Sequence, residues 1–254
     1  MRQTASAELG LRPRLSLTIQ REITRLLSPI SFTLIWIVLR FVRGHRFEGL
    51  AEVRREYAGI RSRSAGPMLV CANHLTMVDS FLITSALGSP VRHILHYSGV
   101  PWNVPERLNF AVQPWQRAII YVLKCIPIQR GGKRSEVAGV LARLAYLLRR
   151  GETALIFPEG GRSRSGRVEP EAAATGVGRV IRLVPNCRVL CVYLRGRRQQ
   201  SWSFLPERKD RFDVAIREIE PKTDHAGLRG SRDLVRQVVK TLHEMEQEHF
   251  DGRE

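Results

Sequence analysis

The stretch Pro67-Met-Leu-Val-Cys-Ala-Asn-His-Leu-Thr-Met-Val-Asp79 decides the fold and places the first polar motif. Its first five residues form a short apolar run, which is typical of a strand buried in a sheet. The run ends at Asn73-His74, so this strand would deliver His74 to its carboxyl end. In open α/β sheets, sites collect beyond the carboxyl ends of strands. We therefore expect His74 to lie in such a site.

Comparable apolar runs recur on both sides of this stretch, and helical patterns separate most of them. The sequence predicts further strands at residues 91–96, 126–129, 153–157, 189–194 and 212–219, and helices at residues 113–124, 135–150 and 232–248. Strands that alternate with helices favour an α/β fold, here a single domain with a central, mostly parallel sheet covered by helices. No internal repeat or long linker divides this body, which we expect to span residues 45–254.

Residues 1–44 have a different character. From residue 15 to residue 27, Leu15, Ile19 and Ile23 recur at helical spacing while Arg21 and Arg25 supply a polar side, which is typical of a basic amphipathic helix. Ser28-Pro29 should break it, and residues 30–39 then form an apolar run of about ten residues, too short to cross a ~30 Å hydrocarbon core. We expect an N-terminal membrane-associated helical hairpin that lies in one leaflet and is retained as an anchor.

Three alternatives remain for this segment. It could form two ordinary core helices, or one spanning helix over residues 26–42, which would have to tolerate Pro29. A cleaved signal peptide is disfavoured because His45, Arg46 and Phe47 follow the apolar run where a small-residue cleavage site would stand. We expect residues 1–11 and the last few residues to be frayed.

The charge of the chain indicates an anionic partner. There are 41 Lys and Arg against 24 Asp and Glu, for a net charge of +17. An anionic membrane, phosphorylated substrates or nucleic acid would each fit. Nucleic acid is disfavoured because the cations are scattered and neither a helix-turn-helix, a zinc motif nor an aromatic stacking platform is visible. The four cysteines are irregularly spaced without a Cys-x-x-Cys pair, so we expect them to be reduced and mostly buried: Cys71, Cys125, Cys187 and Cys191.

His74 precedes Asp79 by five positions. On a regular helix that spacing turns the two side chains roughly 140° apart. If His74 lies in the loop after the strand and Asp79 in the first turn of the next helix, the carboxylate can reach Nδ1 and leave Nε2 free to take a proton. This arrangement would make a general base and its orienting group, although a His-x4-Asp pair alone is also common in ordinary loops.

A second motif follows the apolar run at residues 153–157. It reads Phe157-Pro-Glu-Gly-Gly-Arg-Ser-Arg-Ser-Gly166. A turn rich in glycine and arginine exposes backbone N–H groups and guanidinium groups, which is what phosphate recognition requires. Taken alone, it could equally be a solvated surface loop.

Together these motifs resemble the glycerolipid acyltransferase family, which includes the lysophosphatidic acid acyltransferases. Members carry Asn-His-x4-Asp and, about eighty residues later, Phe-Pro-Glu-Gly-Thr-Arg-Ser; here Asn73-His74 and Asp79 match the first block and residues 157–163 the second. Residues 126–130, which end at Arg130, and residues 189–194 resemble two weaker blocks. The resemblance spans roughly residues 66–196.

The resemblance implies a sequential acyl transfer without a covalent enzyme intermediate. His74 would deprotonate the hydroxyl of a lysolipid, Asp79 would orient His74, and the oxygen would attack the thioester of acyl-CoA or acyl carrier protein. It further implies substrate-binding positions at Arg130, Glu159, Gly160, Gly161 and Arg162, with the arginines facing a phosphate. No cofactor or metal is implied, and the sequence shows no metal-ligand set.

Three departures bear on the acceptor. Gly161 stands where the family has Thr, Cys191 where it has Pro, and Ala174 where a basic residue is common. The resemblance implies acylation of 1-acyl-sn-glycerol 3-phosphate to phosphatidic acid. Reduced cysteines and a cytosolic pool of thioester donors indicate the cytoplasmic face of a membrane, as in a bacterial inner membrane. The alternatives are another acceptor, such as lyso-ornithine lipid, and a membrane-bound scaffold without activity.

Overall fold

The computed structural model describes residues 9–64, 66–171 and 173–252. Its strands are β1 (Arg46–Phe47), β2 (Met68–Ala72), β3 (Trp102–Asn103), β4 (Thr153–Ile156), β5 (Arg188–Gly196) and β6 (Arg211–Ile219). Its α-helices are α1 (Leu11–Ile37), α2 (Leu50–Arg63), α3 (Asp79–Leu87), α4 (Pro90–Leu95), α5 (Arg107–Phe110), α6 (Pro114–Val122), α7 (Arg134–Arg149), α8 (Thr175–Leu183) and α9 (Gly227–Asp251).

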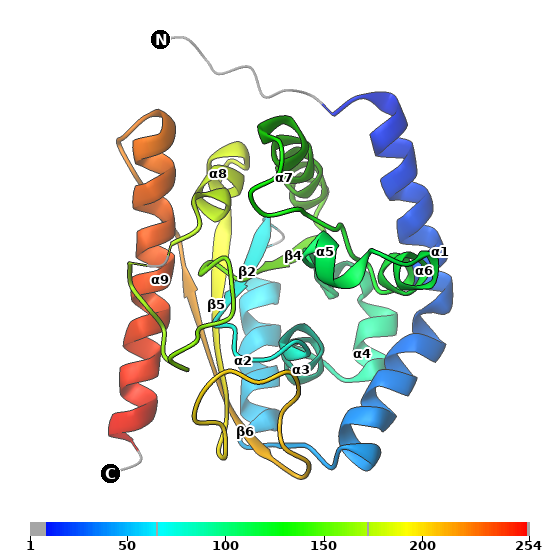
Figure 1. Ribbon diagram of the computed structural model, residues 1–254, viewed down its shortest axis with the longest axis vertical. Coiled ribbons are helices and arrows are strands. Elements are labelled where there is room, and N and C mark those ends of the chain that lie inside the picture. The colour runs from blue at the N-terminus through cyan, green and yellow to red at the C-terminus, as the bar shows by residue number, and fades with distance from the viewer. Residues whose placement is uncertain (1–8, 65, 172, 253–254) are drawn as a thin grey trace.

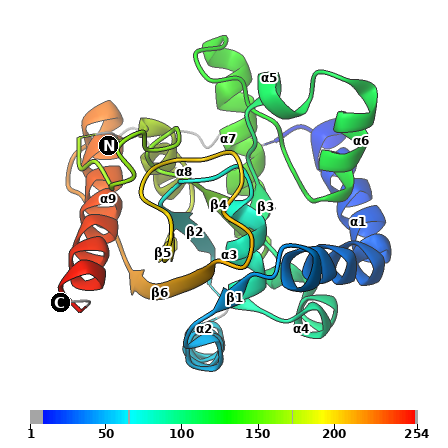
Figure 2. The ribbon, with the colours of Figure 1, turned by 60° about the horizontal axis from the view of Figure 1, so that its bottom comes forward.

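The described strands form one mostly parallel sheet in the order β1-β6-β5-β2-β4-β3. β2 lies in its centre, parallel to β4 on one side and to β5 on the other, whereas β6 runs antiparallel to β5. Helices cover both faces, with α7, α8 and α9 on one and α2 and α3 on the other (Figures 1 and 2). The predicted α/β fold with a central, mostly parallel sheet is confirmed.

The apolar run at β2 explains why the core has two halves. Successive side chains of a strand point to opposite faces. Leu69 and Cys71 accordingly pack with α7, α8 and α9, and Met68, Val70 and Ala72 pack with α2 and α3. A strand buried on both faces reads as a continuous apolar run. All four cysteines are buried and free, as the sequence predicts.

Residues 91–96 and 126–129 do not form the strands predicted for them. The first is helix α4, because Ser89 accepts a hydrogen bond from the Arg92 amide and Pro90 occupies the first turn. The second is an extended segment that makes only isolated bridges, from Cys125 to Asn103 and from Ile128 to Glu106. The predicted helices at residues 113–124, 135–150 and 232–248 correspond to α6, α7 and α9.

The predicted helical hairpin is wrong, because α1 runs without a break through Pro29 and continues as a π-helix, Val38–Val42. Proline removes the amide that would bond the carbonyl of Arg25, four residues earlier. The Ser28 hydroxyl donates to that same carbonyl at 2.7 Å and so replaces the lost bond. The frayed residues expected at 1–8 and 253–254 lie outside the described residues, whereas α1 already begins at Leu11.

The amphipathicity of α1 is inverted relative to a helix on a soluble core. Its buried side facing the body includes Gln20, Thr24 and Ser28, one turn apart. Its outward side is apolar, with Leu15, Leu26 and Ile30 between 58% and 80% exposed. By length and composition, α1 with its π-helical end is the one helix within the described chain that could cross a membrane, which is a weak indication of membrane association.

A buried ionic cluster attaches α1 to the body. The carboxylate of Glu152 accepts hydrogen bonds from Arg21 of α1 at 2.8 Å and from the indole of Trp102 at 2.9 Å, and it pairs with the Lys124 ammonium at 2.7 Å. Burial lowers the pKa of Lys124 to about 8. Gln20 adds hydrogen bonds to the carbonyls of Tyr121 and Cys125. These contacts connect the N-terminal helix to the edge of the sheet at β3 and β4.

Candidate active site

The loop of residues 73–79, here called the histidine loop, leaves the sheet where β2 ends. Asn73 fixes the point of departure, because its side-chain amide donates to the carbonyl of Leu194 on β5 at 2.9 Å and accepts from the Leu194 amide at 2.8 Å. These two bonds continue the pairing of β2 with β5 for one more residue. His74 follows directly, so the sheet itself determines its place.

His74 and Asp79 meet as the sequence predicts. The Nδ1 atom of His74 lies 3.0 Å from Oδ2 of Asp79, which is the first residue of α3. The same carboxylate accepts hydrogen bonds from the amides of Leu75 at 2.6 Å and Thr76 at 2.8 Å, and from the Thr76 hydroxyl. A carboxylate with this many donors at a helix N-terminus is held in one orientation.

The His74 ring is held on its face by Phe157 as well as at its edge by Asp79. It stacks on Phe157 with ring centroids 3.9 Å apart and planes 12° from parallel. With Nδ1–H donating to Asp79, the neutral ring presents Nε2 as a proton acceptor. Asp79 also stabilises the imidazolium that forms when Nε2 takes a proton. The pair can therefore act as a general base and its orienting group.

The turn of residues 158–166, here called the arginine turn, follows β4 and touches the histidine loop. Ser163 donates its amide to the His74 carbonyl at 3.0 Å. Gly160 has φ +70°, a conformation that favours glycine, and a Cβ there would lie 3.0 Å from the Cβ of Ala174. Since the Ala174 amide donates to the Pro158 carbonyl at 2.7 Å, a small residue at 174 fits against the turn.

Glu159 contacts the backbone of His74. Its carboxylate accepts the backbone amide of His74 at 3.2 Å. Burial raises the pKa of Glu159 to about 8, and this effect outweighs the hydrogen bond from His74, which lowers the pKa. Glu159 therefore connects the two segments from inside and does not line the cavity described below.

Two aromatic side chains hold Arg162, and the sequence analysis missed both. The guanidinium carbon of Arg162 lies 4.8 Å from the ring centre of Trp202 and 5.3 Å from that of Phe204, within the range of cation–π attraction. Their segment bonds to the histidine loop through Met77 N–H to Phe204 O and Ser203 N–H to Leu75 O. One guanidinium nitrogen, Nη1, is buried without a hydrogen-bond partner among the described residues.

Arg130 approaches the arginine turn from the extended segment after α6. Its Nε lies 3.2 Å from a carboxylate oxygen of Glu106, a residue that the sequence analysis did not single out. A Cβ on Gly161 would lie 3.4 Å from Nη1 of Arg130. The absence of a side chain at Gly161 therefore leaves the Arg130 guanidinium in contact distance of the turn.

A cavity of about 670 Å³ joins these groups. His74, Arg130, Gly161 and Arg162 line it, together with Arg164 and Trp202. Apolar side chains such as Phe81, Phe110 and Ile119 form much of the remaining wall. Asp79 stands behind His74, and Gly160 shapes the turn. Within the described residues, no group of three or more His, Cys, Asp or Glu could hold a metal ion.

Comparison with known proteins agrees with this arrangement. No curated protein matched the sequence. The family model described as Acyltransferase matches residues 46–195, more than half of the chain, and this span includes the histidine loop, Arg130 and the arginine turn. The chain therefore belongs to the Acyltransferase family, the family of the glycerolipid acyltransferases.

Proposed function

We propose that the protein transfers a fatty acyl group from acyl-CoA or acyl carrier protein to the free hydroxyl of a lysophospholipid, most simply 1-acyl-sn-glycerol 3-phosphate, to give phosphatidic acid. Membership of the family supports acyl transfer to a lipid acceptor in general. The observation that carries the specific proposal is the oriented His74–Asp79 pair beside Arg130 and Arg162 in one cavity.

The reaction follows from the free Nε2 atom of His74. Nε2 takes the proton of the acceptor hydroxyl as the oxygen attacks the thioester carbonyl. The tetrahedral intermediate collapses, the carbon–sulfur bond breaks, and the imidazolium returns its proton to the leaving thiolate. Asp79 stabilises the imidazolium between these steps, so no covalent acyl-enzyme, metal or resident cofactor is required.

The acceptor phosphate would lie near Arg162 and Arg130. An Arg–phosphate contact is charge-assisted, and Arg162 has a guanidinium nitrogen without a protein partner among the described residues. The apolar wall suits an acyl chain. Gly161 supports the alternative of a different lyso-lipid acceptor, such as lyso-ornithine lipid, because the turn lacks the hydroxyl usual in the family and leaves room beside Arg130.

The inverted amphipathicity of α1 supports a monotopic place on the membrane. Its polar residues make hydrogen bonds to the body. If the helix separated from the body to span a bilayer alone, these polar groups would be left without partners. Exposed apolar side chains on α4, α5 and α6, such as Leu95, Leu108 and Trp115, extend the apolar surface. We place this surface on the cytoplasmic leaflet, because thioester donors and reduced cysteines belong to that compartment.

The test is product analysis with the purified full chain in mixed micelles, defined lysolipids and both donor types. Replacement of His74 by Ala should reduce kcat by about 10²–10⁴-fold, the usual contribution of a positioned general base. His225→Ala, at an exposed histidine in the chain's C-terminal third, is the matched control and should keep full activity. Unchanged turnover in His74→Ala would exclude the mechanism, and inactivity of the natural sequence with every donor and acceptor would favour the scaffold.

A further inference from the structure

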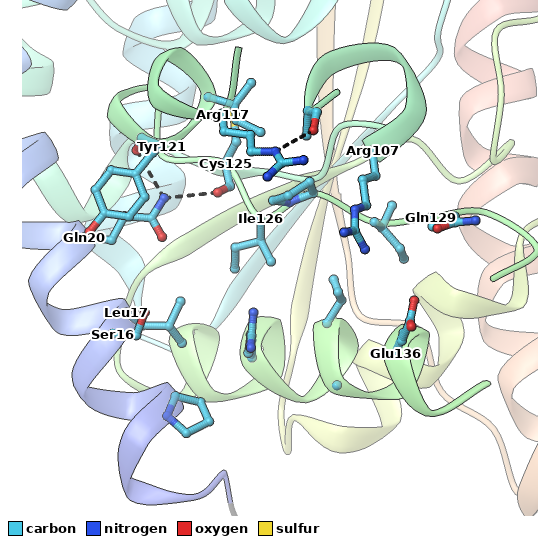
Figure 3. Close-up of a pocket in the computed structure, with 18 of the residues that line it drawn as sticks. Ser16, Leu17, Gln20, Arg107, Arg117, Tyr121, Cys125, Ile126, Gln129 and Glu136 are labelled. Atoms are coloured by element: carbon cyan, nitrogen blue, oxygen red, sulfur yellow. Dashed lines mark hydrogen bonds between the residues drawn. The ribbon is translucent and has the colours of Figure 1, made fainter. Parts of the chain in front are cut away.

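A second cavity, of about 740 Å³, lies beside the candidate active site (Figure 3). α1, α6, α7 and the extended segment at residues 125–129 contribute to its lining. Ile120 and Cys125 line both cavities, so they form part of a shared wall. The second cavity contains neither His74 nor any residue of the arginine turn. It is therefore a separate compartment that adjoins the proposed site.

The charged side chains that line this cavity are mostly cationic. Arg107, Arg117 and Arg143 contribute to it, against the single carboxylate of Glu136. Arg117 is held in place by donating to the carbonyls of Ala111 at 2.9 Å and Val112 at 3.3 Å, which leave its positive charge unneutralised. Arg107 and Arg143 pair with no carboxylate within the part of the chain that the structure describes. Figure 3 shows Arg107 and Glu136 on opposite sides of the cavity.

Much of the remaining lining is apolar and belongs to elements with an apolar exterior. Leu17, Ile126 and Val140 form buried parts of the wall. The same helices expose apolar side chains outside the cavity, among them Leu15 on α1 and Trp115 on α6. A ligand that suits this combination has a negatively charged head and an apolar chain, and it can arrive from a lipid surface.

We propose that the second cavity binds an anionic phospholipid, with its phosphate among Arg107, Arg117 and Arg143 and one acyl chain along Leu17, Ile126 and Val140. A phosphate forms charge-assisted hydrogen bonds with two or more arginines. A zwitterionic lipid has the same phosphate, but the arginines repel the cationic group of its headgroup, so an anionic lipid is favoured. The bound lipid would contact Ile120 and Cys125 from the side opposite the proposed acceptor. Lipid composition would then influence the shape of the candidate active site through this wall.

Gly139 of α7 permits a direct test. Of the two cavities, Gly139 lines only the second, and a Cβ built on it meets nothing within 4 Å. Gly139→Phe should therefore fill the cavity without a clash, whereas Gly139→Ala is the matched control, which adds one methyl group and improves helix propensity. The probe is dihexanoyl phosphatidylglycerol below its critical micelle concentration, with dihexanoyl phosphatidylcholine for comparison, titrated calorimetrically into the full chain.

We expect phosphatidylglycerol to bind the natural sequence and Gly139→Ala equally, and to bind Gly139→Phe and Arg143→Gln about tenfold more weakly or worse, since each loses space or a charge-assisted contact. Arg162→Gln should keep the affinity, because Arg162 belongs to the other cavity. Equal binding to Gly139→Phe, or equal binding of phosphatidylcholine, would overturn the proposal. Displacement of the lipid by coenzyme A, with a raised KM for the donor in Gly139→Phe, would show that the cavity binds a phosphorylated donor instead.

Discussion

The histidine loop and the arginine turn meet at one cavity, but the fold holds them in different ways. In the histidine loop, Asp79 accepts four hydrogen bonds and Asn73 extends the sheet, so His74 has one orientation. In the arginine turn, Arg162 packs against the aromatic faces of Trp202 and Phe204, and Gly161 has no side chain that would restrict the turn. The difference suggests that the proton acceptor is preorganised, while the part that would contact the headgroup can adapt to its ligand.

The largest effect should come from disturbing the preorganised side. Asp79→Asn replaces a carboxylate oxygen that faces three N–H donors, counting Nδ1–H of His74, by an oxygen or an NH₂ group without charge. We expect kcat to fall by about 10²–10⁴-fold with little change in KM, because the imidazolium loses its counter-charge and the ring its fixed tautomer. Steady-state kinetics checks this. Asp224→Asn, at an exposed position, should be indistinguishable from the natural sequence, and a fully active Asp79→Asn would contradict the comparison.

A smaller and more selective effect should come from the arginine turn. Arg162→Gln should raise KM about 10–100-fold for an acceptor that carries a phosphate and much less for one that does not, since a contact to a charged group contributes about 1.5–3 kcal/mol. Kinetics with matched pairs of acceptors measures the ratio. Trp202→Ala should weaken binding of the phosphate-bearing acceptor only a few-fold. Trp202→Phe should keep most of the affinity, because an aromatic ring face still contacts Arg162. An equal rise in KM for both acceptors would mean that Arg162 does not bind the acceptor phosphate.

A third effect should appear in stability at the junction between the two segments. The pKa of Glu159 is raised from 4.5 to about 8 in the folded protein, so the folded state binds more protons than the unfolded state between these values. The free energy of unfolding should therefore fall as pH rises through this window, and Glu159→Gln should remove that part of the slope. Thermal melting at several pH values measures the difference. Glu171→Gln, at an exposed glutamate, is the control and should keep the natural slope.

The sequence predicts the preorganised side well because its determinants are local. Because their positions are five apart, the side chains of His74 and Asp79 could not meet if both lay on one regular helix. The apolar run before Asn73 places the pair at the end of a strand. The contact at 3.0 Å confirms that geometry. The roles of these residues in catalysis, and the division of the chain at residue 44, stay predictions.

The adaptable side could not be predicted in the same way, because its contacts are distant in sequence. Trp202 and Phe204 reach Arg162 from a segment beyond the matched residues 46–195, and their only local signal is two aromatic residues in a polar stretch. Pro29 misled the prediction of a hairpin, because the compensating bond depends on the rotamer of Ser28. For residues 91–96, Ser89-Pro90 is a sequence signal for a helix start, but the apolar residues that follow led to the prediction of a strand.

The ionic cluster around Glu152 has a consequence for attempts to dissect the molecule. A shortened chain that begins after α1 would leave the Glu152 carboxylate with Lys124 and Trp102 but without Arg21, and would uncover the carbonyls that Gln20 satisfies. It would also lose Leu17 and uncover the part of the main core against which Leu17 packs. Removing a helix whose outward face is apolar would therefore not yield a better-behaved soluble enzyme. Helix α1 also forms part of the wall of the body, and detergent that covers its apolar outer face is the gentler route to purification.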